Sequence, residues 1–226
     1  MAKNKTLKFE NPKVTVDIII FTIEDNKLKT LLIKRKSPPF KGKWALPGGF
    51  LKKDEDIYNA AQRELNEETG IKGVYLEQLY TFGEPKRDPR GRVVTVAYFA
   101  LVPRELMKIK AADDATDAKL FSIADSPVLA FDHRKILNYA LYRIRNKIQY
   151  TNVIWSLLSK KFTLTEIQKV YEIIWGRRID KRNFRKKLLS LGLLKSAKET
   201  LTGLRQRPAK FYSFKTTKYV ELKRFF

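Results

Sequence analysis

The residues best placed to do chemistry are three glutamates that follow Arg63. Glu67 and Glu68 stand at positions i+3 and i+4 from Glu64, and on an α-helix these positions share one face. Three carboxylates so close together repel one another unless a cation joins them. Hard oxygen ligands of this kind suit Mg²⁺ bound together with substrate phosphates. The spacing therefore predicts a site that holds a divalent metal against a phosphorylated ligand.

The candidate catalytic set is Arg63, Glu64, Glu67 and Glu68. We expect the three carboxylates to bind Mg²⁺ (or Mn²⁺), and one of them to orient or deprotonate an attacking water. The arginine keeps its proton and holds a carboxylate in place. Gly48 and Gly49 let the backbone approach a ligand, and we expect the Gly48 carbonyl to be a further metal donor. The plain alternative is a solvated glutamate-rich face, which the preceding Pro-Gly-Gly argues against.

The elements that must position this site follow from the hydrophobic pattern. Two β-rich runs, Thr15–Phe21 and Leu28–Arg35, flank a turn and predict a hairpin. A helix from about Asp56 to Thr69 carries the carboxylates and stops at Gly70. Further along we expect strands at Val74–Thr81, Val93–Val102 and Leu120–Ile123, an acidic loop at Ala111–Ala118 and a helix at Phe131–Arg145. This order predicts a mixed-sheet α/β sandwich.

The charge of the chain is distributed unevenly. The formal net charge is +23, of which residues 1–140 carry +6 and residues 141–226 carry +17. Such asymmetry predicts two domains, at residues 1–148 and 149–226, the second facing a polyanion. A merely soluble surface is the alternative, but the basic residues fall in a helical arrangement that favours nucleic acid.

The second half has the element order of a winged helix-turn-helix. A short helix at Asn152–Lys160 precedes a capping box formed by Thr163 and Glu166. Asp180 caps a basic helix, and Lys195–Phe214 forms a basic hairpin. The basic helix is expected in a major groove, with Asn183 able to read adenine and the hairpin on phosphate. The candidate DNA-binding residues are Lys181, Arg182, Asn183, Arg185, Lys186, Arg205, Arg207 and Lys210.

Composition excludes several other classes of protein. The chain has no cysteine, which excludes disulfides, zinc–thiolate sites and a cysteine nucleophile. The amino terminus has no apolar segment typical of a secretion signal. The apolar run Val14–Thr22 is interrupted by Asp17 and is too short to cross a bilayer. We expect a soluble cytoplasmic protein.

The segment around the glutamates resembles the Nudix box. The matching positions are Gly49, Glu55, Arg63, Glu64, Leu65, Glu67, Glu68, Gly70 and Ile71. The resemblance implies an α/β/α Nudix fold over roughly residues 10–145 and metal-dependent cleavage of nucleoside diphosphates linked to another moiety. It identifies a class of chemistry and leaves the substrate open.

Three later segments are similar to ADP-ribose pyrophosphatase-type Nudix domains, namely Arg87–Arg92, Ala112–Ala115 and Leu129–His133. The resemblance implies ADP-ribose as ligand. Arginines form paired hydrogen bonds to pyrophosphate, so the candidate ligand-binding residues are Arg35, Gly49, Arg87 and Arg92. Ordinary surface arginines are the alternative. We expect His133 to be a helix-start residue rather than a catalytic base, and a role for Asp113, Asp114 and Asp117 stays open.

The whole chain resembles Nudix-related transcriptional regulators of NAD and sugar metabolism, with Ile179–Lys186 especially similar. That resemblance implies a homodimer that binds a palindromic double-stranded DNA operator and senses ADP-ribose or a sugar. Many such regulators carry an eroded Nudix box, whereas this box is intact, so hydrolysis stays open. The alternatives are a housekeeping ADP-ribose pyrophosphatase with an accessory basic domain and, ranked last, an RNA-processing Nudix enzyme.

Overall fold

The first unit is built around one long buried strand. A computed structural model describes residues 11–71, 73–109, 115–201 and 209–223 of the chain. Strand β1 (Lys13–Glu24) is buried on both faces from Thr15 to Thr22, as expected for a strand covered on both sides. It pairs parallel with β6 (Val93–Leu101) and antiparallel with β2 (Lys27–Arg35). The sheet is therefore mixed, and the predicted hairpin is confirmed.

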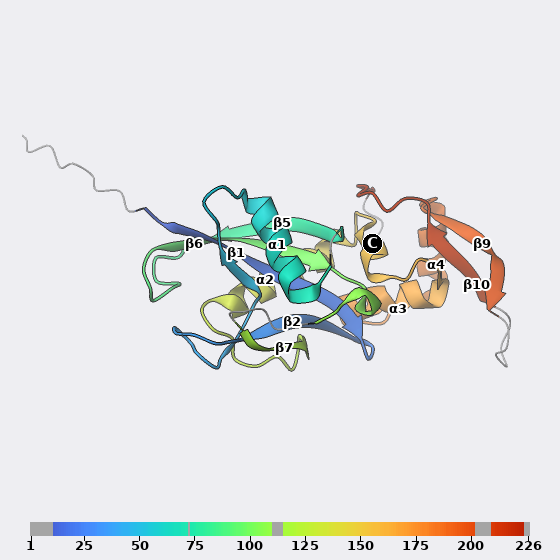
Figure 1. The fold of residues 1–226 in the computed structure, drawn as a ribbon. Coiled ribbons are helices and arrows are strands. Elements are labelled where there is room, and N and C mark those ends of the chain that lie inside the picture. Colours follow the sequence, from blue (N-terminus) through green and yellow to red (C-terminus); the bar gives the residue numbers. More distant parts are fainter. Residues whose placement is uncertain (1–10, 72, 110–114, 202–208, 224–226) are drawn as a thin grey trace, which may run out of the picture.

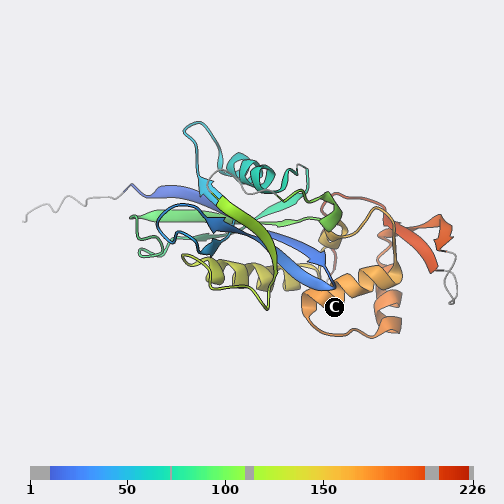
Figure 2. The ribbon, with the colours of Figure 1, turned by 60° about the horizontal axis from the view of Figure 1, so that its bottom comes forward.

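Two helices cover the two faces of this sheet (Figures 1 and 2). The strand order is β3-β2-β1-β6-β5, with β4 on β1 and β7 on β2. The remaining elements are β3 (Trp44–Ala45), β4 (Gly48–Phe50), α1 (Ile57–Thr69), β5 (Tyr75–Phe82), the 3-10 helix η1 (Arg104–Leu106), β7 (Ala115–Ser122) and α2 (His133–Lys147). Ile18 and Ile20 of β1 share a core with α1, while Ile19 and Phe21 share one with α2. This is the predicted α/β/α sandwich.

The helix that carries the glutamates has the predicted ends. Asp56 caps α1 by accepting a hydrogen bond from the Asn59 N–H at 2.8 Å. Gly70 ends the helix at φ +69°, in the left-handed region that favours glycine, and its N–H donates to the Asn66 carbonyl. Both signals are local in sequence, which is why the helix could be predicted closely.

The second unit is a winged helix, as predicted. It comprises the 3-10 helix η2 (Val153–Leu157), β8 (Phe162–Thr163), α3 (Leu164–Trp175), α4 (Lys181–Ser190), β9 (Leu194–Leu201) and β10 (Ala209–Phe214). The strands form a separate sheet in the order β8-β10-β9. Thr163 and Glu166 form the expected capping box, and Asp180 caps α4. The expected short helix at Asn152–Lys160 is the single 3-10 segment η2.

Helix α2 joins the two units. Its cap Ile148 belongs to one hydrophobic cluster that runs from Ile19 of β1 to Leu188 of α4. Arg145 Nε donates to the Ile174 carbonyl, and Trp175 Nε1 donates to the Arg145 carbonyl, both at 2.9 Å. The expected domain boundary at residue 148 falls at the end of this helix. The winged helix is therefore packed against the first unit rather than tethered to it.

One predicted loop is partly strand. Residues 115–118 were expected in an acidic loop, but they begin β7, where Asp117 pairs with Lys34 of β2. The open edge of β2 satisfies the backbone of this segment, which outweighs its weak β propensity. Asp113 and Asp114 lie outside the described residues. Within the described ranges, none of the helices is long and apolar enough to span a membrane.

Candidate ligand pocket and nucleic-acid interface

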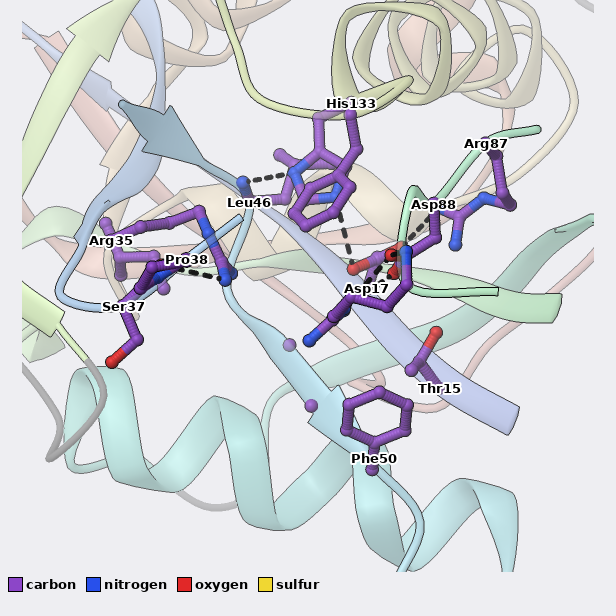
Figure 3. A pocket seen from close by; sticks show the side chains of 15 residues that line it. Thr15, Asp17, Arg35, Ser37, Pro38, Leu46, Phe50, Arg87, Asp88 and His133 are labelled. Atoms are coloured by element: carbon purple, nitrogen blue, oxygen red, sulfur yellow. Dashed lines mark hydrogen bonds and ion pairs between the residues drawn. The ribbon is translucent and has the colours of Figure 1, made fainter. Parts of the chain in front are cut away.

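A cavity of about 260 Å³ lies at the end of the sheet remote from the winged helix, and Figure 3 shows the side chains that line it. Its walls come from β1, β2, β4, the loop between β5 and β6, and the start of α2. Its polar lining residues are Thr15, Asp17, Arg35, Ser37, Arg87, Asp88, Arg90 and His133. Segments distant in sequence thus meet around one concave site.

The floor of this pocket is a buried charge network (Figure 3). Arg87 Nη2 contacts Asp17 Oδ2 at 3.2 Å and Asp132 Oδ1 at 2.7 Å, and its Nε donates to Asp132 Oδ2 at 3.0 Å. The Arg87 side chain is only 4% exposed. Two carboxylates therefore hold this guanidinium, which fixes β1, the β5–β6 loop and the start of α2 relative to one another.

His133 closes the network as a neutral side chain. Its Nδ1 accepts a hydrogen bond from the Leu46 N–H at 2.8 Å, and its Nε2 lies 3.6 Å from Asp17 Oδ1. Burial lowers the pKa of His133, with Asp17 opposing the shift and Arg87 adding to it. The residue begins α2, as predicted. It orients the Leu46–Gly48 approach to the pocket and lies beside Asp17.

Aromatic rings and arginines form the rim. The Arg90 guanidinium lies 5.1 Å from the Phe50 ring centroid and 5.6 Å from that of Phe131, and Arg35 lies 4.9 Å from Phe131. Phe131 has φ +51°, an uncommon conformation for a bulky residue and one that marks functional sites. Flat apolar faces beside fixed cations suit a ligand that combines an aromatic ring with phosphate.

Arg63 is the centre of the Nudix-box charges. Its Nε contacts Glu55 Oε1 at 2.8 Å, and its Nη1 contacts Glu64 Oε1 at 2.7 Å and Glu67 Oε2 at 3.3 Å. Glu55 and Glu64 raise the pKa of Arg63, Glu55 most strongly, and Arg63 in turn lowers the pKa of Glu55. The like charges on α1 are thus held together by an internal cation, as the sequence predicted for Arg63.

The donor set suits a divalent metal in type. Glu64 and Glu68 are buried on α1, Glu67 is more exposed, and all three present hard oxygens. A Cβ at Gly49 would lie 2.3 Å from Glu64 Oε1, so a side chain at this position would displace that carboxylate. Among the described residues, no three histidine, aspartate or glutamate side chains are already grouped closely enough to hold an ion. Arg63 occupies the position between Glu64 and Glu67.

The other predicted ligand contacts fall in different places. Arg35 and Gly49 line the pocket, and so does Arg87, although its guanidinium is held by Asp17 and Asp132. Arg92 lies outside this pocket and donates to the Gly83 carbonyl at 2.5 Å.

Sequence reasoning missed Asp17, Arg90 and Phe131 as pocket residues. The signal for Asp17 was present, because it is the one charge in the apolar run Val14–Thr22. Nothing in the sequence marked the other two apart from the segments that contain them.

The predicted nucleic-acid face of α4 is exposed and basic. Lys181, Arg182, Asn183 and Lys186 are exposed, while Phe184 and Leu188 on the opposite side are buried. Arg185 is partly buried, and its Nη2 donates to Thr165 Oγ1 at 2.8 Å, which ties α4 to α3. Lys210 is exposed on β10. The expected contacts Arg205 and Arg207 lie outside the described residues.

Comparison with known proteins agrees with both halves of this architecture. The Nudix domain family matches residues 12–140, and the NrtR DNA-binding winged helix domain family matches residues 154–214. The ADPR responsive transcriptional repressor NtrR of Acinetobacter baylyi is 37% identical, covering 97% of this chain and 88% of its own. The ADP-ribose pyrophosphatase of Methanocaldococcus jannaschii is 45% identical over 56% of this chain and 72% of its own.

Solved structures of Shewanella oneidensis NrtR are also similar. The structure of that protein with a 27mer DNA has a TM-score of 0.80 at 38% identity, covering 89% of this chain and 93% of that chain. Its Nudix domain with ADP ribose has a TM-score of 0.55 at 40% identity, covering 60% of this chain and 90% of that one. The chain therefore belongs to the NrtR family, in which a Nudix domain is followed by a DNA-binding winged helix domain.

Proposed function

We propose that this protein is a transcriptional repressor that binds ADP-ribose in its Nudix pocket and operator DNA through α4. The observation that carries the proposal is the position of α2, which starts in the ligand pocket at His133 and contacts the winged helix through Arg145 in its last turn. Its relative NtrR is named an ADPR responsive transcriptional repressor. Its relative NrtR has been solved with a 27mer DNA, and the Nudix domain of NrtR with ADP ribose. Such a protein acts on the chromosome, so a cytoplasmic location belongs to the proposal.

In the pocket, ADP-ribose recognition divides between rings and cations. We assign the adenine to the aromatic rim of Phe50 and Phe131, where stacking with a planar base is favourable. Arg35 and Arg90 face the same cavity and suit the pyrophosphate. Arg87 acts through Asp17 and Asp132 as a positioning residue. Arg92, which is partly buried and donates to the Gly83 carbonyl, keeps only an outer role in this assignment.

Nudix hydrolases typically use divalent metal ions, and we propose Mg²⁺ (or Mn²⁺) for this chain. Glu64, Glu67 and Glu68, with the Gly48 carbonyl, would hold it. When bound, the ion would neutralise pyrophosphate charge and activate a water. Arg63 would then keep Glu55 and Glu64 in position.

Hydrolysis of ADP-ribose is the second candidate function. The intact Nudix box and the 45% identical ADP-ribose pyrophosphatase favour it. Glu67 and Glu68 would then be catalytic. Release of AMP from ADP-ribose, dependent on Mg²⁺ and lost in Glu67→Gln, would establish this activity. Absence of AMP with ADP-ribose still bound would leave sensing as the sole role of the site.

On DNA, we place α4 in the major groove of a palindromic operator bound by a homodimer. Lys181, Arg182 and Lys186 are exposed and form no ion pair with another described residue. Their cations are therefore available for phosphate, while Asn183 can form paired hydrogen bonds to adenine. Lys210 lies on β10, in the hairpin of β9 and β10 that forms the wing. Arg205 and Arg207 were also predicted to contact phosphate from this hairpin.

Helix α2 provides the physical connection between the two sites. Fifteen residues of helix span about 22 Å. At its far end, Lys147 Nζ contacts Glu77 Oε2 of β5 at 2.9 Å and the Tyr219 hydroxyl at 3.4 Å. Tyr219 belongs to the segment that follows the winged helix. A shift of α2 would therefore alter contacts with both units. ADP-ribose regulates DNA binding if it prefers one arrangement of α2.

The proposal is tested with DNA from upstream of the protein's own gene. Fluorescence anisotropy measures DNA affinity at low salt, with and without ADP-ribose and Mg²⁺, and the same samples are assayed for AMP. Specific binding that ADP-ribose changes supports the repressor. AMP release without specific DNA binding favours the pyrophosphatase with an accessory basic domain.

A further inference from the structure

A second cavity lies between the two units, at the opposite end of the sheet from the Nudix pocket. Its volume is about 450 Å³, within the range of small-molecule sites, which often form between domains. Tyr75 and Leu101 line it from the first unit, and Trp155, Phe162 and Phe214 line it from the second. Its walls are therefore largely apolar and aromatic, and they belong to two units at once.

Two polar atoms on the lining residues are buried without a hydrogen-bond partner in the described part of the chain. They are the Ser156 hydroxyl and the Trp155 indole N–H, both on η2. Ser156 is only 2% exposed. Buried donors are nearly always paired, and an unmade hydrogen bond is costly. A ligand with an acceptor atom at η2 would satisfy both.

The mouth of the cavity is positively charged. Lys160 and Lys195 line it and are exposed, and neither forms an ion pair with any other described residue. The nearby Glu105 carboxylate accepts a hydrogen bond from Ser159, which links η1 of the first unit to the second. Two cations beside an apolar chamber complement a molecule with a flat apolar body and an anionic group.

We propose that this interdomain cavity is a second ligand site, selective for a small aromatic anion such as an aromatic carboxylate or sulfonate. The ring packs among Tyr75, Phe162 and Phe214. The anionic group lies between Lys160 and Lys195, and its acceptor atoms reach Ser156 and Trp155. Because both units line the site, an occupant stabilises one interdomain arrangement. An effect on DNA rests on the proposed function, whereas binding itself does not.

The probe is 8-anilinonaphthalene-1-sulfonate, which combines an aromatic body with one anionic group. Its fluorescence is titrated on the full chain with saturating ADP-ribose present, so that the Nudix pocket is filled. The test variant is Lys160→Glu/Lys195→Glu. The matched control is Lys86→Glu/Lys169→Glu, which makes the same charge change at exposed lysines outside this cavity.

We expect saturable binding at one site, weakened at least tenfold in the test variant and less than twofold in the control. The uncharged N-phenyl-1-naphthylamine should bind at least tenfold more weakly than the sulfonate. Equal losses in both charge variants, or no loss in the test variant, would overturn the site. Equal affinity for the two probes would overturn its selectivity for anions.

A third variant keeps the proposal testable without any charge change. Ser156→Ala removes the unpartnered hydroxyl, so the free protein should be no less stable in urea, while sulfonate affinity falls severalfold. Ser213→Ala, on the same cavity wall, is the control for a lost hydroxyl. ADP-ribose affinity should be unchanged in all variants, so a negative result here is separable from failure of the proposed function. Unchanged sulfonate affinity in Ser156→Ala would contradict the assigned position of the anion.

Discussion

In the Nudix domain the charged side chains of the pocket floor and of the Nudix box are held by one another, whereas on α4 they are exposed and directed outward. Arg87 lies between Asp17 and Asp132, and Arg63 lies among three glutamates. Lys181 and Arg182, by contrast, have no ion-pair partner within the described residues. The pocket is preorganised before any ligand binds. The basic helix gains its interaction energy only when a polyanion arrives.

This difference separates two kinds of mutational effect. Removing a member of a buried charge network leaves its partners uncompensated, which lowers the stability of the fold. Removing an exposed cation leaves the fold intact and lowers affinity for nucleic acid. The following variants test that separation, beginning with the largest expected effect.

Arg87→Met should lower the free energy of unfolding by about 3 to 5 kcal/mol, because it leaves the buried Asp17 and the partly buried Asp132 without their cation. Urea unfolding followed by circular dichroism measures this. Arg92→Met is the matched control, since among the described residues that side chain makes one hydrogen bond, to the Gly83 carbonyl, and its loss should cost about 1 kcal/mol. Equal costs for the two variants would show that the network does not support the pocket.

Replacing Lys181, Arg182 and Lys186 together by glutamine should weaken DNA binding on the order of 100-fold at 0.1 M salt. The slope of log K against log salt should fall by about 2.7, or about 0.9 for each lost phosphate contact. Unfolding in urea should not change, because the side chains are exposed.

The control for that variant changes Lys52, Lys53 and Lys86 to glutamine, which removes the same charge from exposed positions of the Nudix unit. A similar loss of DNA affinity in both would mean that net charge, and not α4, governs binding.

Arg90→Met should weaken ADP-ribose binding about tenfold, because it removes the cation that Asp88 holds beside the rings of Phe50 and Phe131. Isothermal titration calorimetry gives the affinity. Lys86→Met removes a cation from the same loop but outside the pocket lining, and should bind like the native protein. If both variants bind alike, the assignment of the rim to the ligand is wrong.

His133 should make stability depend on pH below its ordinary pKa of about 6.5. Burial lowers its pKa in the folded protein, so the unfolded chain takes up the proton first. The contribution of neutral His133 to the free energy of unfolding is therefore fully present above pH 6.5. It is lost as the pH falls below that value, at no more than about 1.4 kcal/mol per pH unit. Urea unfolding at pH 7.5 and 5.5 measures this loss.

His133→Asn retains an acceptor for the Leu46 N–H but does not titrate. It should reduce the difference in stability between the two pH values. The chain has no other histidine, so an unchanged difference would contradict a neutral buried His133.

The two regions also differ in how far their sequences predicted them. Helix ends, the Thr163–Glu166 capping box and the basic face of α4 depend on residues within one or two turns, so local pattern was sufficient. The pocket floor could not be predicted in this way. Arg87 meets Asp17 and Asp132 across 70 and 45 residues, and that meeting depends on the parallel pairing of β1 with β6.

The packing of the winged helix on the first unit was likewise beyond local pattern. The sequence indicated two domains, but contacts such as Arg145 to Ile174 and Lys147 to Glu77 depend on tertiary arrangement. These contacts place the far end of α2 against both units. Through them, α2 physically connects the ligand pocket with the winged helix, a connection that the sequence alone did not predict.

Reciprocal coupling between the two ligands tests this route most directly. The affinity of operator DNA is measured with and without saturating ADP-ribose, and the affinity of ADP-ribose with and without saturating DNA. If α2 couples the sites, both affinities change by the same factor, of about fivefold or more. Two tight but independent affinities would contradict the account and leave the two domains functionally separate.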